Sequence, residues 1–167
     1  MATPRLTAPE VAHKIIIDKM TEHDLLEVVE IEELSGLSPW GWDAYHKELQ
    51  SRDSVIMLVA RERAAYSGTM KGVFGFVVAR MIVDELHVNN IAVRPECRRM
   101  GIGEHLLGRA LTWGRSQGAQ RALLEVRTSN DAAKGLYRRC GFEVTGRRRR
   151  YYRMPLEDAL IMSVSLR

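Results

Sequence analysis

The chain has 167 residues, of which 46% are hydrophobic and 28% are charged, and its formal net charge is +4. This length and composition are typical of one packed domain and exclude a low-complexity or largely disordered protein. The longest apolar runs, such as residues 55–60 and 73–79, have only the length of a strand, which excludes a membrane-spanning helix.

The first 14 residues contain prolines and mixed charges but no apolar signal segment, so we expect a flexible leader before a single domain at residues 15–167. Without an export signal the protein is expected to be cytoplasmic, and Cys97 and Cys140 are expected to be free thiols. Neither cysteine has metal-ligand spacing and the five histidines form no pair, so the sequence predicts no metal site.

The first predicted elements are a strand and two helices. Residues 15–19 form a short β-branched run, which predicts a strand. Thr21 and Asp24 have the spacing of a capping box, and apolar positions then recur at helical spacing within residues 25–31. After a break that contains glycines and a proline, residues 42–49 carry apolar side chains at the same spacing, which predicts a second, short helix.

Three strand-like runs follow, at residues 54–61, 72–81 and 84–93. A turn-rich stretch at residues 65–71 separates the first two, and a tight connection around Val83 separates the last two. Short connections join antiparallel strands, so the three runs predict an antiparallel meander.

The last third of the chain alternates between helix and strand. Its elements are predicted at residues 101–117, 121–127, 130–140, 142–152 and 159–166. Each of the two helices ends at a glycine, and Ser129 or Asn130 can cap the second one. The predicted order is βααβββαβαββ, which indicates an α/β fold with a mixed sheet.

A glycine-rich turn at residues 98–103 lies between the third strand of the meander and a helix. The first N–H groups of a helix lack intrahelical partners, and Gly101 and Gly103 would let a pyrophosphate approach them. Arg98 and Arg99 add positive charge. The sequence therefore favours a phosphate-binding turn, although glycines that serve only tight packing are an open alternative.

Two other phosphate-binding motifs do not fit this turn. A dinucleotide fingerprint requires glycine at position 106, which is leucine, and a P-loop requires lysine after Gly108, where Arg109 stands. Coenzyme A, which carries a pyrophosphate, remains a suitable ligand.

Two polar residues downstream have both a structural and a chemical interpretation. Glu125 interrupts an apolar strand, so its carboxylate either faces solvent through simple alternation or lines a cleft. Tyr137 lies one turn before the end of its helix, where an aromatic residue ordinarily packs in the core. The residues alone leave both alternatives open.

Several short segments together resemble the GNAT superfamily of N-acetyltransferases, and specifically its branch of bacterial ribosomal-protein alanine N-acetyltransferases (RimI). The segments that carry the resemblance are residues 98–103, 124–127, 129–130, 136–137 and 141–142. Pieces that are less universal in the superfamily, at residues 39–40, 90–93, 151–152 and 157–159, extend it over nearly the whole chain. The resemblance implies the GNAT fold, with a mixed, mostly antiparallel sheet of about seven strands flanked by about four helices.

The resemblance also implies acetyl-CoA as cosubstrate and assigns residues to it. The residues expected to bind the cofactor are Ile91, Ala92, Val93, Arg98, Arg99, Met100, Gly101, Ile102, Gly103, Glu104 and Asn130. The turn would hold the pyrophosphate, and residues 91–93 would lie beside the pantetheine.

The family's general base matches Glu125 and its general acid matches Tyr137, so the resemblance favours catalytic roles for both. A carboxylate is a weak base in water, and Leu123, Leu124 and Val126 are suitable apolar neighbours to strengthen it. Backbone N–H groups of a strand disrupted near residues 90–93 could stabilise the thioester oxygen.

The acceptor is expected between a loop and a strand pair. The resemblance assigns acceptor binding to Leu37, Pro39, Trp40, Tyr151 and Tyr152, although the tyrosines could be ordinary strand aromatics. The expected reaction is acetylation of the N-terminal alanine of a small-subunit ribosomal protein. Other N-termini, lysines or small amines are the enzymatic alternatives, and an acyl-CoA-sensing module is the non-enzymatic one.

The four arginines at residues 147–150 form a basic run that could contact RNA phosphates. Alternate residues of a strand face opposite sides, however, so the four side chains cannot act together. We expect a solvated surface there and no direct binding of nucleic acid.

Overall fold

The structure is a computed structural model that describes residues 15–51, 53–62 and 72–167. The expected leader and the turn-rich stretch at residues 65–71 lie outside these ranges. The helices are α2 (Leu25–Leu34), α3 (Gly41–Leu49), α4 (Ile102–Ser116) and α5 (Asp131–Arg139). The strands are β1 (Ile15–Lys19), β2 (Val55–Glu62), β3 (Val73–Ile82), β4 (Glu85–Val93), β5 (Arg121–Arg127), β6 (Glu143–Arg153) and β7 (Leu156–Ser165).

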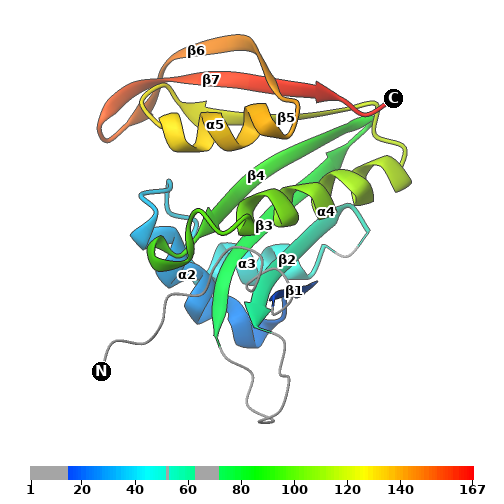
Figure 1. The fold of residues 1–167 in the computed structure, drawn as a ribbon, viewed down its shortest axis with the longest axis vertical. Coiled ribbons are helices and arrows are strands. Elements are labelled where there is room, and N and C mark those ends of the chain that lie inside the picture. Colours follow the sequence, from blue (N-terminus) through cyan, green and yellow to red (C-terminus); the bar gives the residue numbers. More distant parts are fainter. Residues whose placement is uncertain (1–14, 52, 63–71) are drawn as a thin grey trace.

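These elements follow the predicted order, and the seven strands form one twisted sheet (Figure 1). The strand order is β1-β2-β3-β4-β5-β7-β6, and every neighbouring pair is antiparallel except β4 and β5, which are parallel. The prediction of a mixed, mostly antiparallel sheet with four helices is confirmed.

Local polar groups set where two of the helices begin. The Thr21 N–H donates to Asp24 Oδ2 at 2.8 Å, as the capping-box spacing predicts, but the first turn, at Glu22–Asp24, is a 3-10 turn ahead of α2. The Asn130 side chain accepts a hydrogen bond from the Ala133 N–H at 3.1 Å, so Asn130 rather than Ser129 caps α5.

The helices cover both faces of the sheet and create two hydrophobic cores. Leu106, Leu107 and Tyr137, from α4 and α5, pack in the first core. The second core contains Ile31 of α2 and Tyr45 of α3. We call the face of the sheet that packs against α4 and α5 the α4 face, and the face that packs against α2 and α3 the α3 face.

A β-bulge in β4 changes which residues face each core. Ala79 of β3 pairs with Val88, whereas the preceding Val78 pairs with Asn90, so Asn89 has no partner in β3. One extra residue reverses the alternation of a strand. Val88 consequently packs in the α4 core, while Ala92, at the same parity, packs in the α3 core. The bulge directly precedes residues 90–93, whose backbone N–H groups are candidate donors to the thioester oxygen.

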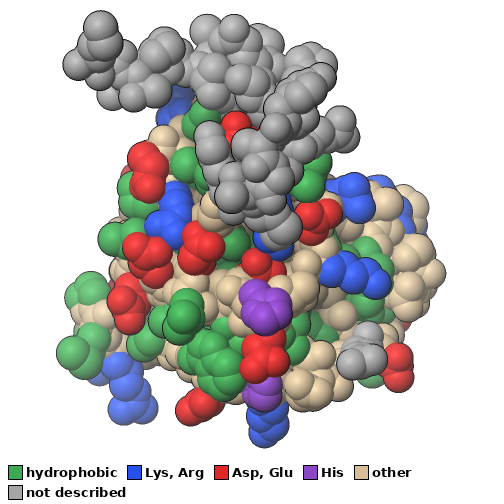
Figure 2. Space-filling model, turned by 90° about the horizontal axis from the view of Figure 1, so that it is seen from below, with side chains coloured by type: hydrophobic (Ala, Val, Ile, Leu, Met, Phe, Trp, Pro, Cys, Tyr) green, Lys and Arg blue, Asp and Glu red, His purple; other side chains and the backbone are tan. Residues whose placement is uncertain are grey.

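None of the helices in the described ranges is long and apolar enough to cross a membrane. On the face farthest from β6 and β7, acidic, basic and apolar side chains are interspersed (Figure 2). No single charge dominates the part of that face that the described residues form (Figure 2).

Candidate active site

The sheet opens between its two parallel strands. β4 and β5 pair only from Glu85 with Arg121 to Val88 with Leu124, although β4 continues to Val93 and β5 to Arg127. Beyond the last pair, the backbone groups on the facing edges of the two strands have no strand partner in this sheet. The opening therefore offers backbone groups of β4 and β5 that no strand of the sheet pairs.

Glu125 is the first residue of β5 beyond the last pair with β4. Its neighbours Leu124 and Val126 are buried in the α4 core, so the pleat of the strand directs Glu125 toward the α3 face. The expectation that Leu124 and Val126 lie beside the carboxylate is therefore wrong, because period-two alternation places both on the opposite face. Leu123, the third expected neighbour, has the parity of Glu125 and shares its face.

The contacts of Glu125 are polar. Its Oε1 lies 2.6 Å from Nε of Arg148, and the Glu125 side chain is 25% exposed. The Tyr151 hydroxyl donates to the same carboxylate, which raises the pKa of Tyr151, and burial adds to that shift. The Arg148 guanidinium lies 5.7 Å from the centre of the Tyr151 ring. A cation and a tyrosine of β6 thus cover the candidate base in this structure.

Tyr137 lies in the α4 core, on the other side of the sheet from Glu125. Its side chain is 7% exposed and its ring centre is 6.1 Å from that of Phe142. Burial raises the pKa of Tyr137 well above its usual value, with smaller contributions from Tyr152 and Cys140. The hydroxyl therefore stays protonated throughout the physiological pH range, as a proton donor requires.

Tyr152 links the two catalytic candidates electrostatically. Burial raises its pKa to about 12, and the Glu125 carboxylate is the next largest cause. Tyr152 in turn contributes to the raised pKa of Tyr137. The Arg127 guanidinium lies 4.1 Å from the centre of the Tyr152 ring, so the ring has a cation–π contact with the last residue of β5. Tyr152 is thus within electrostatic range of both Glu125 and Tyr137.

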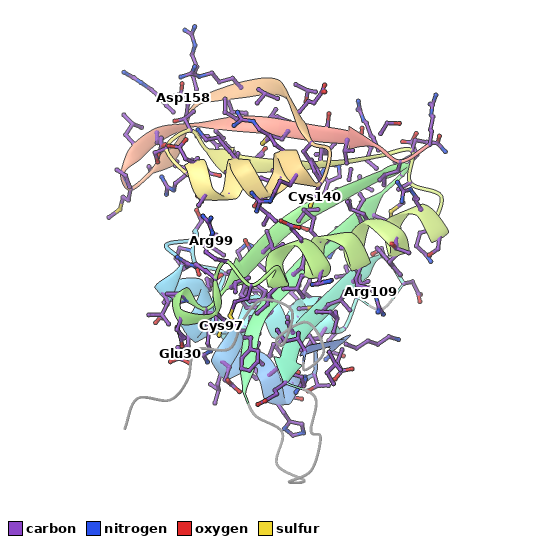
Figure 3. The ribbon with its side chains drawn as sticks, viewed as in Figure 1. Glu30, Cys97, Arg99, Arg109, Cys140 and Asp158 are labelled. Carbon is purple, nitrogen blue, oxygen red and sulfur yellow. The ribbon has the colours of Figure 1, made fainter. Side chains whose placement is uncertain are left out.

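The glycine-rich turn begins α4 with an unusual backbone. Arg99 and Gly101 have left-handed φ values of 65° and 77°, and Gly101 is the N-cap. None of the described residues accepts a hydrogen bond from the N–H groups of Ile102, Gly103 or Glu104. Arg99 lies in the turn on the side toward α5 (Figure 3). The turn thus presents free donors and positive charge.

The side chains of Arg98 and Glu104 and the Cα of Gly103 have contacts within the protein. A Cβ atom on Gly103 would lie 3.0 Å from Leu136, so Gly103 serves close packing of α4 against α5. Arg98 donates to the Val93 carbonyl at 3.0 Å and to Ser35 Oγ at 3.2 Å. Glu104 pairs with Arg139 at 2.5 Å. Tight packing therefore accounts for Gly103, whereas Gly101 provides the left-handed N-cap of α4.

The predicted acceptor residues divide between two regions. Leu37, Pro39 and Trp40 lie in the loop between α2 and α3, and the Trp40 ring centre is 5.3 Å from that of Tyr45 in the α3 core. Tyr151 is 48% exposed beside Glu125. The loop, Tyr151 and the Glu125 carboxylate belong to the α3 face.

Sequence reasoning missed the contact between Arg148 and Glu125. β7 separates β6 from β5 in the sheet, so the Arg148 side chain crosses a strand to reach the carboxylate. The register between β6 and β7 is irregular between Arg148 and Tyr152, and all four arginines of the run are exposed. Only the position of the arginine run, next to Tyr151 and Tyr152 in the sequence, could have indicated that the run adjoins the site.

No group of three potential metal ligands occurs among the described residues.

Residues 25–142, from the start of α2 to the residue before β6, match the sequence pattern of acetyltransferases of the GNAT type. This chain belongs to the acetyltransferase (GNAT) family. The match includes the glycine-rich turn, the opening between β4 and β5, and both catalytic candidates.

Individual relatives narrow the position of the chain within the GNAT family. It is 36% identical to the N-alpha-acetyltransferase RimI of Mycobacterium tuberculosis over 151 residues, which are 89% of this chain and 90% of the relative. It is 31% identical to the ribosomal protein bS18-alanine N-acetyltransferase of Salmonella typhimurium over 152 residues, or 90% of this chain and 97% of the relative. The crystal structure of the ribosomal-protein-S18-alanine N-acetyltransferase from Escherichia coli has a TM-score of 0.75 at 28% identity and covers 91% of this chain and 94% of that one. The chain is an N-acetyltransferase of the RimI branch.

Proposed function

We propose that this GNAT enzyme transfers the acetyl group of acetyl-CoA to the α-amino group at the N-terminus of a protein. The observation that carries the proposal is the opening between β4 and β5, which has a carboxylate on one face and a buried tyrosine on the other. Two substrates that enter from opposite faces would meet there. The names of the relatives, which are N-terminal acetyltransferases, support the same reaction.

The residues at the start of α4 fit the pyrophosphate of acetyl-CoA. Three N–H groups without an acceptor among the described residues, the positive end of the α4 dipole and Arg99 favour a doubly charged anion. Ile91 and Val93 of β4 would then border the pantetheine, with the unpaired edge of the strand beside them. Asn130 is exposed, but its side-chain oxygen already caps α5, so only its amide is free for the cofactor.

Replacing Gly101 with alanine tests the turn. A left-handed conformation costs an L-residue about 1–2 kcal/mol, so the variant should be destabilised by that amount and its KM for acetyl-CoA should rise. Gly108→Ala is the matched control, because Gly108 lies within α4 with open space around its Cα and alanine there should add about 0.5–1 kcal/mol of stability. Urea unfolding and acetyl-CoA kinetics measure both. Equal acetyl-CoA KM values for the two variants would contradict a role of the turn in cofactor binding.

Acetyl-CoA supplies the acetyl group as an activated thioester, and the enzyme's residues would manage the protons. The N-terminal amine has a pKa of about 7.7–8.0 and is largely protonated at neutral pH, so it must lose a proton before it attacks. The Glu125 carboxylate would accept that proton, directly or through water. The Tyr137 hydroxyl would donate a proton to the departing sulfur. No covalent enzyme intermediate is required.

Arg148 must share Glu125 with the acceptor in this mechanism. The ammonium group of a peptide N-terminus can take the place of the guanidinium at the carboxylate, because it is also a cation that donates hydrogen bonds to carboxylate oxygens. The pair is partly exposed, so its separation costs little. Glu125 would therefore first bind the protonated amine and then accept its proton.

The proposed acceptor is the N-terminal alanine of a small-subunit ribosomal protein. This rests on the named substrates of the bS18-alanine N-acetyltransferases among the relatives. Trp40 on the loop and Tyr151 on β6 would flank the first residues of the peptide, because both belong to the α3 face with Glu125.

Initial rates on a peptide panel test the acceptor class. The panel contains peptides that differ only in the first residue, together with lysine-containing peptides whose N-terminus is blocked. We expect the highest kcat/KM for a free N-terminal alanine and no turnover of blocked peptides. Turnover of blocked peptides alone would identify a lysine acetyltransferase, and turnover of neither class would leave small amines as the acceptor.

A further inference from the structure

Glu32 of α2 is a fully buried carboxylate that belongs to none of the roles assigned above. Its side chain is 0% exposed and accepts three hydrogen bonds. The donors are the Trp40 N–H at 2.9 Å, the Gly41 N–H at 3.2 Å and the Tyr45 hydroxyl at 2.7 Å. No lysine or arginine pairs with it among the residues that the structure describes. The carboxylate is thus held by dipoles, two of them from the backbone where α3 begins.

The network continues from Glu32 to β4. The Tyr45 hydroxyl, which donates to Glu32, accepts a hydrogen bond from Asn90 Nδ2 at 2.9 Å. Tyr45 is 0% exposed and Asn90 is 8% exposed. Burial and the neighbouring carboxylate raise the pKa of Tyr45, so its hydroxyl keeps the proton that it shares with Glu32. The three side chains form a buried chain from α2 through α3 to the sheet.

The bulge at Asn89 explains why Asn90 can reach Tyr45. Without the extra residue, Asn90 would share the face of Val88, which packs in the α4 core. The bulge turns the Asn90 side chain toward α3 instead, where the Tyr45 hydroxyl satisfies its amide. The network therefore holds β4 in its bulged form at the point where the strand begins to separate from β5.

Both ends of the network lie in the proposed active site. At one end Glu32 fixes the backbone of Trp40, in the loop proposed to bind the acceptor, and the Trp40 ring packs on Tyr45. At the other end Asn90 directly precedes Ile91, in the strand proposed to border acetyl-CoA. Replacing buried polar groups by apolar residues of similar volume is often neutral or stabilising, so stability is a weak reason for three such side chains here.

We propose that Glu32 is a positioning residue that, through Tyr45 and Asn90, sets the acceptor loop at a fixed distance from β4. This inference rests on the proposed function, because it assigns the loop to the acceptor and the strand to the donor. It adds that the two substrate sites share one rigid buried connection. Weakening that connection should impair binding of the acceptor far more than binding of acetyl-CoA, because the start of α4, proposed to hold the pyrophosphate, takes no part in the network.

Tyr45→Phe is the most specific probe, because it removes one hydroxyl and keeps the ring contacts with Trp40 and Phe76. Glu32 loses the hydrogen bond that it accepts from Tyr45, and Asn90 loses the one that it donates to Tyr45. These losses should raise the peptide KM about tenfold. The dissociation constant of acetyl-CoA, measured by calorimetry, should stay within about twofold. Glu32→Gln should have the same effect, and the double variant should be no worse than the more affected single variant, because both changes break one network.

Val28→Ala is the matched control, since Val28 is fully buried in the same core but takes no part in the network. It should lower the melting temperature and leave the peptide KM unchanged. A peptide KM that rises as much in this control as in Tyr45→Phe, or single effects that simply add in the double variant, would overturn the proposal.

Amide hydrogen exchange gives a readout that does not depend on the substrate. In Tyr45→Phe the N–H groups of Trp40 and Gly41 and those of residues 89–91 should exchange faster than the other amides of the same core, whereas in Val28→Ala they should lose no more protection than those other amides. If no peptide is acetylated but both segments respond together, the proposed function fails and the connection stands. If only the loop responds, the connection between loop and strand is refuted.

Discussion

Replacing Glu125 with glutamine is expected to reduce kcat for acetyl transfer by about 10²–10⁴-fold at neutral pH, the usual contribution of a general base. Glutamine has nearly the same shape but cannot accept the proton of the acceptor amine. Glu125 points to the α3 face, away from the start of α4, so the dissociation constant of acetyl-CoA should not change. Stopped assays at saturating acetyl-CoA, with calorimetry for binding, measure both quantities.

The pH dependence of the Glu125→Gln variant provides a sharper test. Without the base, only peptide that is already deprotonated can react, so the rate should rise with pH until the amine pKa of about 7.7–8.0 is passed. Glu143→Gln is the control, because Glu143 is an exposed carboxylate at the start of β6. A kcat that matches the control at neutral pH would rule out Glu125 as the base.

Replacing Tyr137 with phenylalanine is expected to reduce kcat by about 10²–10⁴-fold, because it removes the hydroxyl proposed to protonate the departing sulfur. The ring contact with Phe142 is retained, so the fold should persist. Burial raises the pKa of Tyr137 well above its usual value of about 10. The hydroxyl therefore remains protonated at alkaline pH, and activity should not decline between about pH 8 and pH 10 through this group.

Tyr152→Phe discriminates between the two tyrosines near the opening. Tyr152 is within electrostatic range of both Glu125 and Tyr137, so its hydroxyl is the competing proton donor. We expect Tyr152→Phe to raise the peptide KM and to change kcat far less than Tyr137→Phe. A larger loss of kcat in Tyr152→Phe would transfer the role of the acid to Tyr152.

The order of the elements could be predicted because local signals at several points agree. The capping residues Thr21 and Asn130 and the apolar periodicity of the helices locate the starts of α2 and α5 to within a few residues. The last strand begins three residues earlier than predicted, at Leu156, because its pairing with Arg153 extends the hairpin toward the turn. Such pairing depends on a partner strand and leaves no periodic signal in one segment.

The surroundings of the candidate base could not be predicted from the sequence. Alternation places Leu124 and Val126 on the face opposite Glu125. Residues that are adjacent in the sequence of a strand therefore do not have adjacent side chains. The actual neighbour, Arg148, comes from a strand two positions away in the sheet. Its placement depends on an irregular register between β6 and β7 that single residues do not specify.

The buried network was missed for a related reason. The sequence pattern predicts Tyr45 as an apolar position of a helix and Asn90 as an ordinary strand residue, and neither prediction indicates a contact between them. Their contact requires the bulge at Asn89, which reverses the face of β4 without any glycine or proline to mark it. Glu32 lies among the charged residues that follow Ile31, and nothing in its sequence neighbours distinguishes a buried carboxylate from a solvated one.

We propose that this GNAT enzyme acetylates the α-amino group of a peptide. The most direct test uses one peptide that carries both a free N-terminal alanine and an internal lysine, incubated with the enzyme and acetyl-CoA. Tandem mass spectrometry then locates the added acetyl group. We predict a single acetyl group on the N-terminal alanine, with none on the lysine and none retained on the enzyme. An acetyl group on the lysine alone, or an unmodified peptide, would contradict the claim.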